Sequence, residues 1–240
     1  MITFSNKNHI YIGREAGKEI HEKIKTAKKS VKIVSPYLSP NYIKDLISLH
    51  KKGIKITLVT CDNIEINSYS DFKISDLVKT EKVEDNKLKK SLLKWFIWLF
   101  VGAVISVVIA LVLPILIILA GILFIASIIS LVSSFLILGY SFKYEPIFRI
   151  KVFDSTTGKN PRSTELIHSK IFVIDDEIAF LGSTNFTYSG FKTHYETTIK
   201  VEDKSAVQDI SAEVEKLYSS TELKAKSIEE WVRGGWRGER

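Results

Sequence analysis

The chain of 240 residues is long enough for one ordinary domain, with or without a membrane segment, and its 45% hydrophobic and 25% charged residues are typical of a globular protein. A single cysteine, Cys61, excludes an intramolecular disulfide and fits a reducing compartment. The net charge of +7 favours a polyanion or an anionic membrane surface as partner without choosing between them, and the polar N-terminus does not have the pattern of a signal peptide.

The first quarter of the chain alternates helical and strand patterns. Ile20, Ile24 and Ala27 recur at helical spacing, and Gly53 follows the second helical pattern as a stop signal. The predicted elements are a helix at 15–29, a strand at 31–35, a helix at 40–52 and a strand at 54–60. This order predicts an α/β layer, followed by a polar, Lys-rich stretch at 62–91 that we interpret as mixed helix and linker.

Residues 95–142 contain no charged side chain. A helix needs about 20 apolar residues to cross a bilayer, so this run predicts two tightly joined transmembrane helices, roughly 94–113 and 115–140, on either side of Pro114. A Pro-kinked helix and a re-entrant hairpin are alternatives. Lysines flank the run on both sides, which predicts that both ends lie in the cytoplasm.

The chain after the apolar run predicts further strands. They are expected at 147–153, 166–174, 178–183 and 196–201, with a polar loop at 154–164 and a helix at 204–218. The short polar joint Asp175-Asp176-Glu177 predicts a tight hairpin between the second and third of these strands. Three glycines in residues 227–240 argue against a stable helix there, so we expect a frayed tail despite its two tryptophans.

Four polar side chains are predicted to meet on this hairpin. His168 and Lys170 lie two positions apart on one strand, so both point to the same face, and Ser183 and Asn185 repeat that spacing at the next strand. The ammonium and the amide are donors suited to phosphate oxygens, and a neutral imidazole can attack phosphorus. The pattern indicates a phosphodiester site that needs no metal ion. We interpret the other histidines, His9, His21, His50 and His194, as structural or solvated residues.

The segment from His168 to Asn185 resembles the signature of the phospholipase D superfamily, His-x-Lys-x4-Asp-x6-Gly-Ser-x-Asn, at every defined position. The resemblance extends to the strands at 31–36 and 54–60, and to Glu196, where that family often carries an acidic residue. It covers nearly all of the chain outside the apolar run. It implies an α/β fold with a mixed β-sheet flanked by helices, here with an inserted two-helix transmembrane hairpin.

The resemblance also implies a role for each residue of the motif. His168 would attack phosphorus and form a phosphohistidine, while Lys170 and Asn185 hold the phosphoryl oxygens. Ser183 would add a supporting hydrogen bond, and Glu196 would orient the imidazole of His168.

Asp175 lies an odd number of positions from His168, so on a strand it would face the opposite side of the sheet. We therefore expect a structural or supporting role for it. No cofactor is implied. The sequence holds one such motif, and single-motif members of the family resemble two-motif members by dimerising. The reaction also asks for a second histidine to protonate the leaving oxygen. We therefore expect a homodimer in which a second copy of His168 completes the site.

The preferred substrate is a membrane phospholipid, hydrolysed or transferred at the headgroup, because a membrane hairpin would hold the site near headgroups. The alternative is a membrane-tethered endonuclease acting on DNA or RNA, since single-motif family members include small endonucleases. A non-catalytic membrane scaffold is a third alternative. We expect a multi-pass protein of the cell membrane with a cytoplasmic catalytic domain. The expected divisions are a first half with linker (1–91), the hairpin (92–142), a catalytic second half (143–220) and a tail (221–240).

Overall fold

The computed structural model describes residues 2–4, 8–62, 74–84, 86–110, 116–136, 140–154 and 167–235. The chain divides into two compact units. Unit 1 comprises residues 1–79 and 144–240, and unit 2 comprises residues 80–143. Each unit is considered by itself below.

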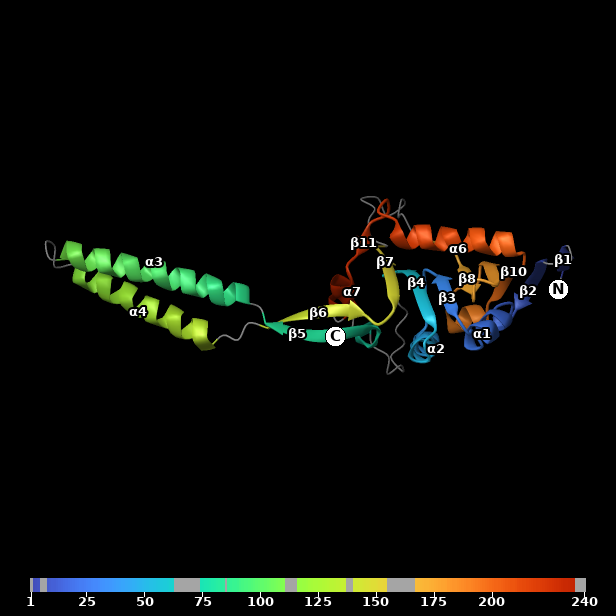
Figure 1. Ribbon diagram of the computed structural model, residues 1–240, viewed down its shortest axis with the longest axis horizontal. Helices are drawn as coiled ribbons and strands as arrows, with labels where there is room; N and C mark the ends of the chain where they lie inside the picture. The colour runs from blue at the N-terminus through green and yellow to red at the C-terminus, as the bar shows by residue number, and fades with distance from the viewer. Residues whose placement is uncertain are drawn as a thin grey trace. The chain divides into compact units, whose positions relative to one another are not determined.

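Unit 1 is built on a mixed β-sheet that nine strands form within the described residues (Figure 1). Its strand order is β1-β2-β10-β9-β8-β3-β4-β7-β11. The strands are β1 (Ile2–Phe4), β2 (Asn8–Arg14), β3 (Ser30–Val34), β4 (Lys55–Cys61), β7 (Arg149–Phe153), β8 (Ile171–Ile174), β9 (Ile178–Gly182), β10 (Tyr195–Val201) and β11 (Ala225–Lys226). The central strands β3, β4 and β7 are parallel, and β8, β9 and β10 follow as antiparallel neighbours on the other side of β3.

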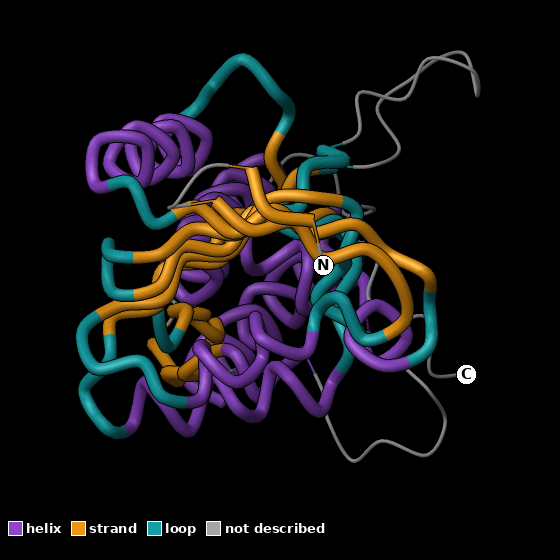
Figure 2. The backbone as a smooth tube through the Cα atoms, turned by 90° about the vertical axis from the view of Figure 1, so that its right-hand side faces the viewer, coloured by secondary structure: helices purple, strands orange, loops and turns teal. Residues whose placement is uncertain are grey.

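Helices cover both faces of this sheet (Figure 2). One layer is built from α1 (Lys18–Lys25) and α2 (Pro40–Lys51), and the other from α6 (Lys204–Ser219). The sequence of β3 explains both layers, because alternate residues of a strand face opposite sides of a sheet. Val31 and Ile33 belong to the cluster with α1 and α2, whereas Val34 belongs to the cluster with α6.

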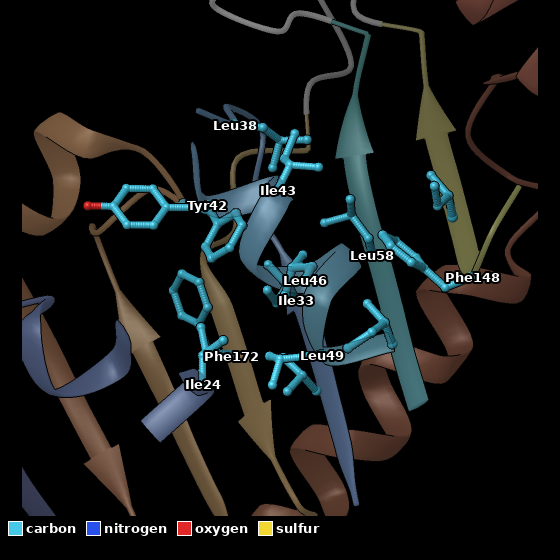
Figure 3. Packing of buried hydrophobic residues seen from close by; sticks show 14 of the residues in the cluster. Ile24, Ile33, Leu38, Tyr42, Ile43, Leu46, Leu49, Leu58, Phe148 and Phe172 are labelled. Atoms are coloured by element: carbon cyan, nitrogen blue, oxygen red, sulfur yellow. The ribbon is translucent and has the colours of Figure 1, made fainter. Parts of the chain in front are cut away.

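The hydrophobic cluster between the sheet and helices α1 and α2 is the larger of the two. It buries the apolar residues that recur at helical spacing in the sequence. Ile24, Leu46 and Phe172 are almost completely buried in it, and Figure 3 shows side chains from α1, α2, β3, β4 and β8 gathered there. Burying one such aliphatic or aromatic side chain stabilises the fold by roughly 1.5–3 kcal/mol relative to leaving it in water. The predicted helices and central strands are thus confirmed, with ends that differ by a few residues.

Three parts of unit 1 differ from the sequence-based expectation. The N-terminal segment forms β1 and β2, and β2 pairs along its whole length with β10. Between β9 and β10 lies the short helix α5 (Tyr188–Lys192). The prediction of a frayed tail was wrong for its first part, because α7 (Ile228–Gly235) forms and buries Trp231 and Val232 in the larger cluster. Burial of Trp231 and Val232 stabilises the helix by more than its glycines destabilise it. Helix propensity, which is a local property, does not include this tertiary contribution.

Unit 2 contains two long helices, α3 (Asn86–Ala110) and α4 (Leu116–Leu136). They pack against each other, and the Ser130 hydroxyl donates to the Leu92 carbonyl oxygen at 3.0 Å. The helical hairpin predicted from the apolar run is therefore present, although α3 starts earlier and α4 ends earlier than expected. The transmembrane part of that prediction is not supported: in the stretches that the structure describes, no helix combines the length and apolarity needed to cross a membrane.

The stretch before the hairpin was expected to be helix and linker. Instead, a 3-10 turn (η1, Ile74–Leu77) leads into β5 (Val78–Glu84), which pairs with β6 (Tyr140–Pro146). Two strands therefore connect with the two ends of the hairpin, where no strand was predicted. The polar loop expected at 154–164 lies outside the described residues except for Asp154, as does the part of the first linker at 63–73.

Candidate active site

The motif residues gather at one edge of the sheet because of strand direction. Strands β8, β9 and β10 run alternately, so the start of β8, the end of β9 and the start of β10 meet at the same edge. Gly182 N–H donates to the Lys170 carbonyl at 3.3 Å, and Ser183 N–H donates to the Thr197 carbonyl at 2.9 Å. These ladder bonds bring three separate stretches of sequence to one surface.

His168 and Lys170 form the first pair at this edge. Both lie just before β8 rather than on a strand as predicted, and His168 is exposed while Lys170 is only 6% exposed. Lys170 Nζ lies 3.0 Å from His168 Nδ1 and 3.1 Å from Nε2, and it donates to the His168 carbonyl at 2.7 Å. Because an ammonium has donors only, a ring nitrogen that accepts from it must present a lone pair. A lone pair on nitrogen is what an attacking imidazole requires.

Ser183 and Glu196 form the second pair. The Ser183 hydroxyl donates to Glu196 Oε2, and Ser183 Oγ accepts from Thr197 N–H at 3.0 Å. Gly182 permits this close approach of β9 to β10, because a Cβ built on it would lie 1.9 Å from the Thr197 carbonyl oxygen. The Glu196 carboxylate is thus buried beside the site with a fixed orientation.

Asn185 lies between β9 and α5. Its neighbour Phe186 is tied to the loop after β3, since Phe186 N–H donates to Ser35 Oγ at 2.9 Å and the Phe186 carbonyl accepts from Ser39 N–H at 3.0 Å. Asn185 Oδ1 is buried and has no hydrogen-bond partner among the described residues. A buried acceptor of this kind is costly unless a donor satisfies it, so the oxygen is open to a hydroxyl of a bound substrate or to water. A phosphoryl oxygen would have to be held by the NH2 group of the same amide, which is its donor.

Electrostatics at the site centre on Lys170 and Glu196. Burial lowers the pKa of Lys170 below its ordinary value, and the Glu196 carboxylate acts in the opposite direction. Glu196 therefore helps to keep the lysine in its charged form, which is the form that can hold a phosphoryl group. Within the part of the chain that the structure describes, no cluster of three or more His, Cys, Asp or Glu residues could hold a metal ion.

Asp175 lies in the β8–β9 turn, away from these pairs. Its carboxylate accepts backbone N–H bonds from Lys28, Lys29 and Ser30 at 2.6–3.1 Å, and it thereby holds the segment that leads into β3. The residue has a φ of 58°, in the left-handed region that aspartate tolerates in turns. Asp176 and Glu177 complete the tight hairpin that the sequence predicted.

Five of the six predicted site residues thus come from one edge of the sheet, with Asp175 in the opposite turn. The pairing of Glu196 with His168 stays a prediction, and the structure adds a further imidazole near that carboxylate. The imidazole beside Glu196 is that of His194, whose Nδ1 lies 3.6 Å from Glu196 Oε1. The sequence pattern led us to interpret His194 as a structural or solvated residue. His194 and Glu196 nevertheless lie two positions apart, the same spacing that indicated His168 and Lys170 as site residues. That spacing was the signal that could have identified it.

Comparisons with known proteins agree with this architecture. A family profile described as "Cardiolipin synthase, PLD-like domain" matches residues 144–218. NucT from Helicobacter pylori is similar in structure, with a TM-score of 0.52 and 16% identity over 92% of this chain and 99% of that one. Nuc from Salmonella typhimurium, described as a phospholipase D family member, gives a TM-score of 0.44 with 12% identity over 92% and 99% of the two chains.

Phosphatidylserine synthase from Haemophilus influenzae Rd KW20 gives a TM-score of 0.42 with 12% identity over 91% of this chain and 39% of the other. None of the curated proteins compared with the chain matches it in sequence. The profile match spans the motif from His168 to Asn185 together with Glu196, and the overall fold is similar to that of NucT. Residues 144–218 therefore resemble a PLD-like domain in sequence.

Proposed function

We propose that the protein is a phosphodiesterase that uses His168 as its nucleophile and acts on membrane phospholipids. The observation that carries the proposal is the contact between Lys170 Nζ and the His168 ring, at the edge where Ser183, Asn185 and Glu196 also lie. This arrangement combines a nucleophile with a cation and an amide for the phosphoryl oxygens. The pairing of β8, β9 and β10 already brings these residues to one edge of the sheet.

The reaction would proceed in two steps. His168 attacks phosphorus, the bond to the leaving oxygen breaks, and a phosphohistidine forms. Water, or an alcohol in a transfer reaction, then attacks phosphorus and releases His168. Lys170 and Asn185 stabilise the charge that develops on the phosphoryl oxygens, an effect that is typically worth several kcal/mol in a preorganised site.

Unit 2 supports a membrane surface as the place of action. Its buried residues include the small Ala103 and Ser127 between the helices, whereas large apolar residues face outward, with Trp98 65% and Ile129 60% exposed. Water disfavours such a surface, but lipid accommodates it, and helix pairs in lipid pack through small residues. We propose that the hairpin attaches the protein to a membrane and so holds the site among headgroups, with the catalytic domain on the cytoplasmic side.

Assembly as a homodimer is a further part of the proposal. Because each chain carries one motif, two chains would bring two copies of His168 and Lys170 to one phosphodiester. Sedimentation of the detergent-solubilised full chain tests this directly, with a monomer at working concentration as the contradicting result.

The deciding experiment compares headgroup release from vesicles of phosphatidylcholine or cardiolipin with cleavage of single- and double-stranded DNA and RNA. The full chain should release headgroup, and it should form an acid-labile phosphoprotein adduct. His168→Ala should lose both turnover and adduct, whereas His9→Ala, toward the opposite end of β10 from the site, should keep both. Cleavage of nucleic acid alone would replace the phospholipid with a nucleic-acid substrate.

Two further measurements test the mechanism and the attachment. A chelator should leave the activity unchanged, and loss of activity would contradict a mechanism without metal ions. Ile122→Asn with Ile129→Asn should lower flotation of the protein with vesicles, because both side chains are exposed on α4. Equal flotation of this variant and the unaltered chain would count against attachment through the hairpin.

A further inference from the structure

The helical hairpin of unit 2 begins with a group of lysines. Residues 86–142 contain four lysines and no Asp, Glu or Arg, and all four lysines lie in the first turns of α3. Three of them, Lys89, Lys90 and Lys94, have exposed side chains. Lys90 and Lys94 are four positions apart, and like charges at this spacing destabilise a helix slightly. An anion beside them removes that repulsion, so this end of α3 is suited to a negatively charged partner.

The lysines continue into a stripe on the side of α3 that does not pack on α4. The packed side is marked by the Leu92 carbonyl, which accepts from the Ser130 hydroxyl of α4, and by Ala103, which is 3% exposed. The opposite side carries exposed side chains that follow one another at three- or four-residue spacing and therefore lie in line on the helix. These five residues, which we call the α3 stripe, are Lys90, Lys94, Trp98, Val101 and Ile105.

The α3 stripe changes from charged to aromatic to aliphatic along the helix axis. At about 1.5 Å per residue, Trp98 lies about 6 Å beyond Lys94, and Ile105 lies about 10 Å beyond Trp98. Trp98 is 65% exposed and Ile105 is 53% exposed, so both are open to a partner.

A lipid leaflet changes in the same order, from charged headgroup to interface to hydrocarbon, and tryptophan prefers the interfacial level. Lysine beside an apolar surface lays its stem on that surface and keeps its ammonium among the headgroups. A nucleic acid also offers phosphates to Lys90 and Lys94, but it offers no apolar partner to Val101 and Ile105. The stripe therefore fits an anionic lipid surface better than a nucleic acid.

We propose that the α3 stripe and Lys89 bind anionic phospholipid headgroups, so that the hairpin attaches the protein to negatively charged membranes in preference to neutral ones. The inference rests on the membrane attachment proposed above and names the lipid class for it. A lysine near an anionic surface typically strengthens binding about fivefold, so three lysines favour anionic over neutral membranes by about 100-fold. Salt weakens this preference, because the Debye length falls from about 10 Å at 0.1 M to about 3 Å at 1 M.

Flotation of the full chain with vesicles tests the proposal. The vesicles consist of phosphatidylcholine alone or of phosphatidylcholine mixed with phosphatidylglycerol, and every protein carries His168→Ala so that no lipid is consumed. The His168→Ala chain should bind the anionic vesicles about 100-fold more strongly than the neutral ones at about 0.1 M salt, and most of this difference should disappear at about 1 M salt.

The deciding variant combines Lys89→Gln, Lys90→Gln and Lys94→Gln. It should lose the preference of about 100-fold and should bind neutral vesicles as before, because glutamine keeps the helix and the exposed apolar residues are unchanged.

The matched control combines Lys44→Gln, Lys51→Gln and Lys52→Gln, which removes the same charge from exposed lysines in and directly after α2 of unit 1. It should keep the preference within about threefold, because these lysines lie outside the hairpin.

Three results would overturn the inference. The first is equal binding of the His168→Ala chain to neutral and anionic vesicles. The second is an equal loss of preference in both triple variants, which would assign the preference to net charge alone. The third is a variant of Lys89, Lys90 and Lys94 that keeps the preference but loses binding of single-stranded DNA, which would assign the lysines to a nucleic acid.

Failure of the proposed function is recognised separately. Both triple variants with His168 intact are assayed on a water-soluble nitrophenyl phosphodiester, which needs no membrane, and they should cleave it at the rate of the unaltered chain. An unaltered chain that cleaves no phosphodiester would contradict the function whatever the vesicles show. A preference for anionic vesicles in an active chain supports both proposals.

Discussion

Asp175 permits a quantitative test of whether the aspartate of the motif is structural. Its Oδ1 accepts from three backbone N–H groups, those of Lys28, Lys29 and Ser30, and Oδ2 accepts from Lys28 as well. Hydrogen bonds to charged groups contribute about 1.5–3 kcal/mol and neutral ones about 0.5–1.5 kcal/mol. In Asp175→Asn the amide oxygen can still occupy the Oδ1 position, so mainly the charge is lost.

Removing about 1 kcal/mol from each of three bonds, with part of that screened by solvent at this half-buried turn, gives a loss of about 2 kcal/mol. For a domain of this size, about 2 kcal/mol corresponds to a fall in Tm of roughly 4–8 °C. Thermal unfolding followed by circular dichroism measures the change. Activity per folded molecule should stay within about threefold, because a structural residue acts through stability.

Asp175→Ala should cost more, about 4 kcal/mol, because it leaves three N–H groups without their acceptor and also places alanine at a positive φ. The opposite pattern would refute the reasoning. An unchanged Tm together with a hundredfold loss of activity in Asp175→Asn would assign this aspartate to the chemistry rather than to the turn.

Three further predictions follow from the same structure. Burial raises the pKa of the Asp175 carboxyl, but the backbone hydrogen bonds that it accepts lower it by more, so the pKa lies below the ordinary 3.8. The stabilisation from the charged carboxylate is therefore present above about pH 4 and is lost as the pH falls through the lower pKa of the folded state. The difference in Tm between Asp175→Asn and the unaltered chain should shrink accordingly at acid pH. Glu196→Gln should remove the influence that raises the pKa of Lys170, so the alkaline fall in phosphodiesterase rate should begin at lower pH, and an unshifted pH profile would contradict this coupling. Gly182→Ala should unfold or severely destabilise unit 1, because its Cβ would meet the Thr197 carbonyl oxygen, whereas Gly121→Ala, with open space around it, should leave thermal stability unchanged or slightly raised.

Local pattern was sufficient for the parts of the site that lie close together in the chain. The spacing of His168 and Lys170, the polar joint at 175–177 and the strands around it specify a hairpin by side-chain alternation and turn chemistry. The same applies to the helices, since the apolar stripes of α1 and α2 repeat at a period that only a helix places on one face. Such features depend on neighbours within a few residues.

The tertiary structure decided what depends on distant segments. The pairing of β2 with β10 sets the position of the start of β10, where Glu196 lies. No local pattern in residues 8–14 predicts that pairing. The imidazole beside Glu196 is that of His194 because the closing of α5 onto β10 places it there.

The sequence by itself thus predicted a set of candidate site residues and determined most of the short elements that hold them, because alternation and helical period are local properties. Only the tertiary structure decided which carboxylate faces which imidazole, and that Asp175 holds residues 28–30 across 145 or more positions of sequence. The physical reason is that hydrogen bonds and ion pairs act over a few ångströms in space, whereas the strand order that brings their partners together results from burying the whole sheet between two layers of helices.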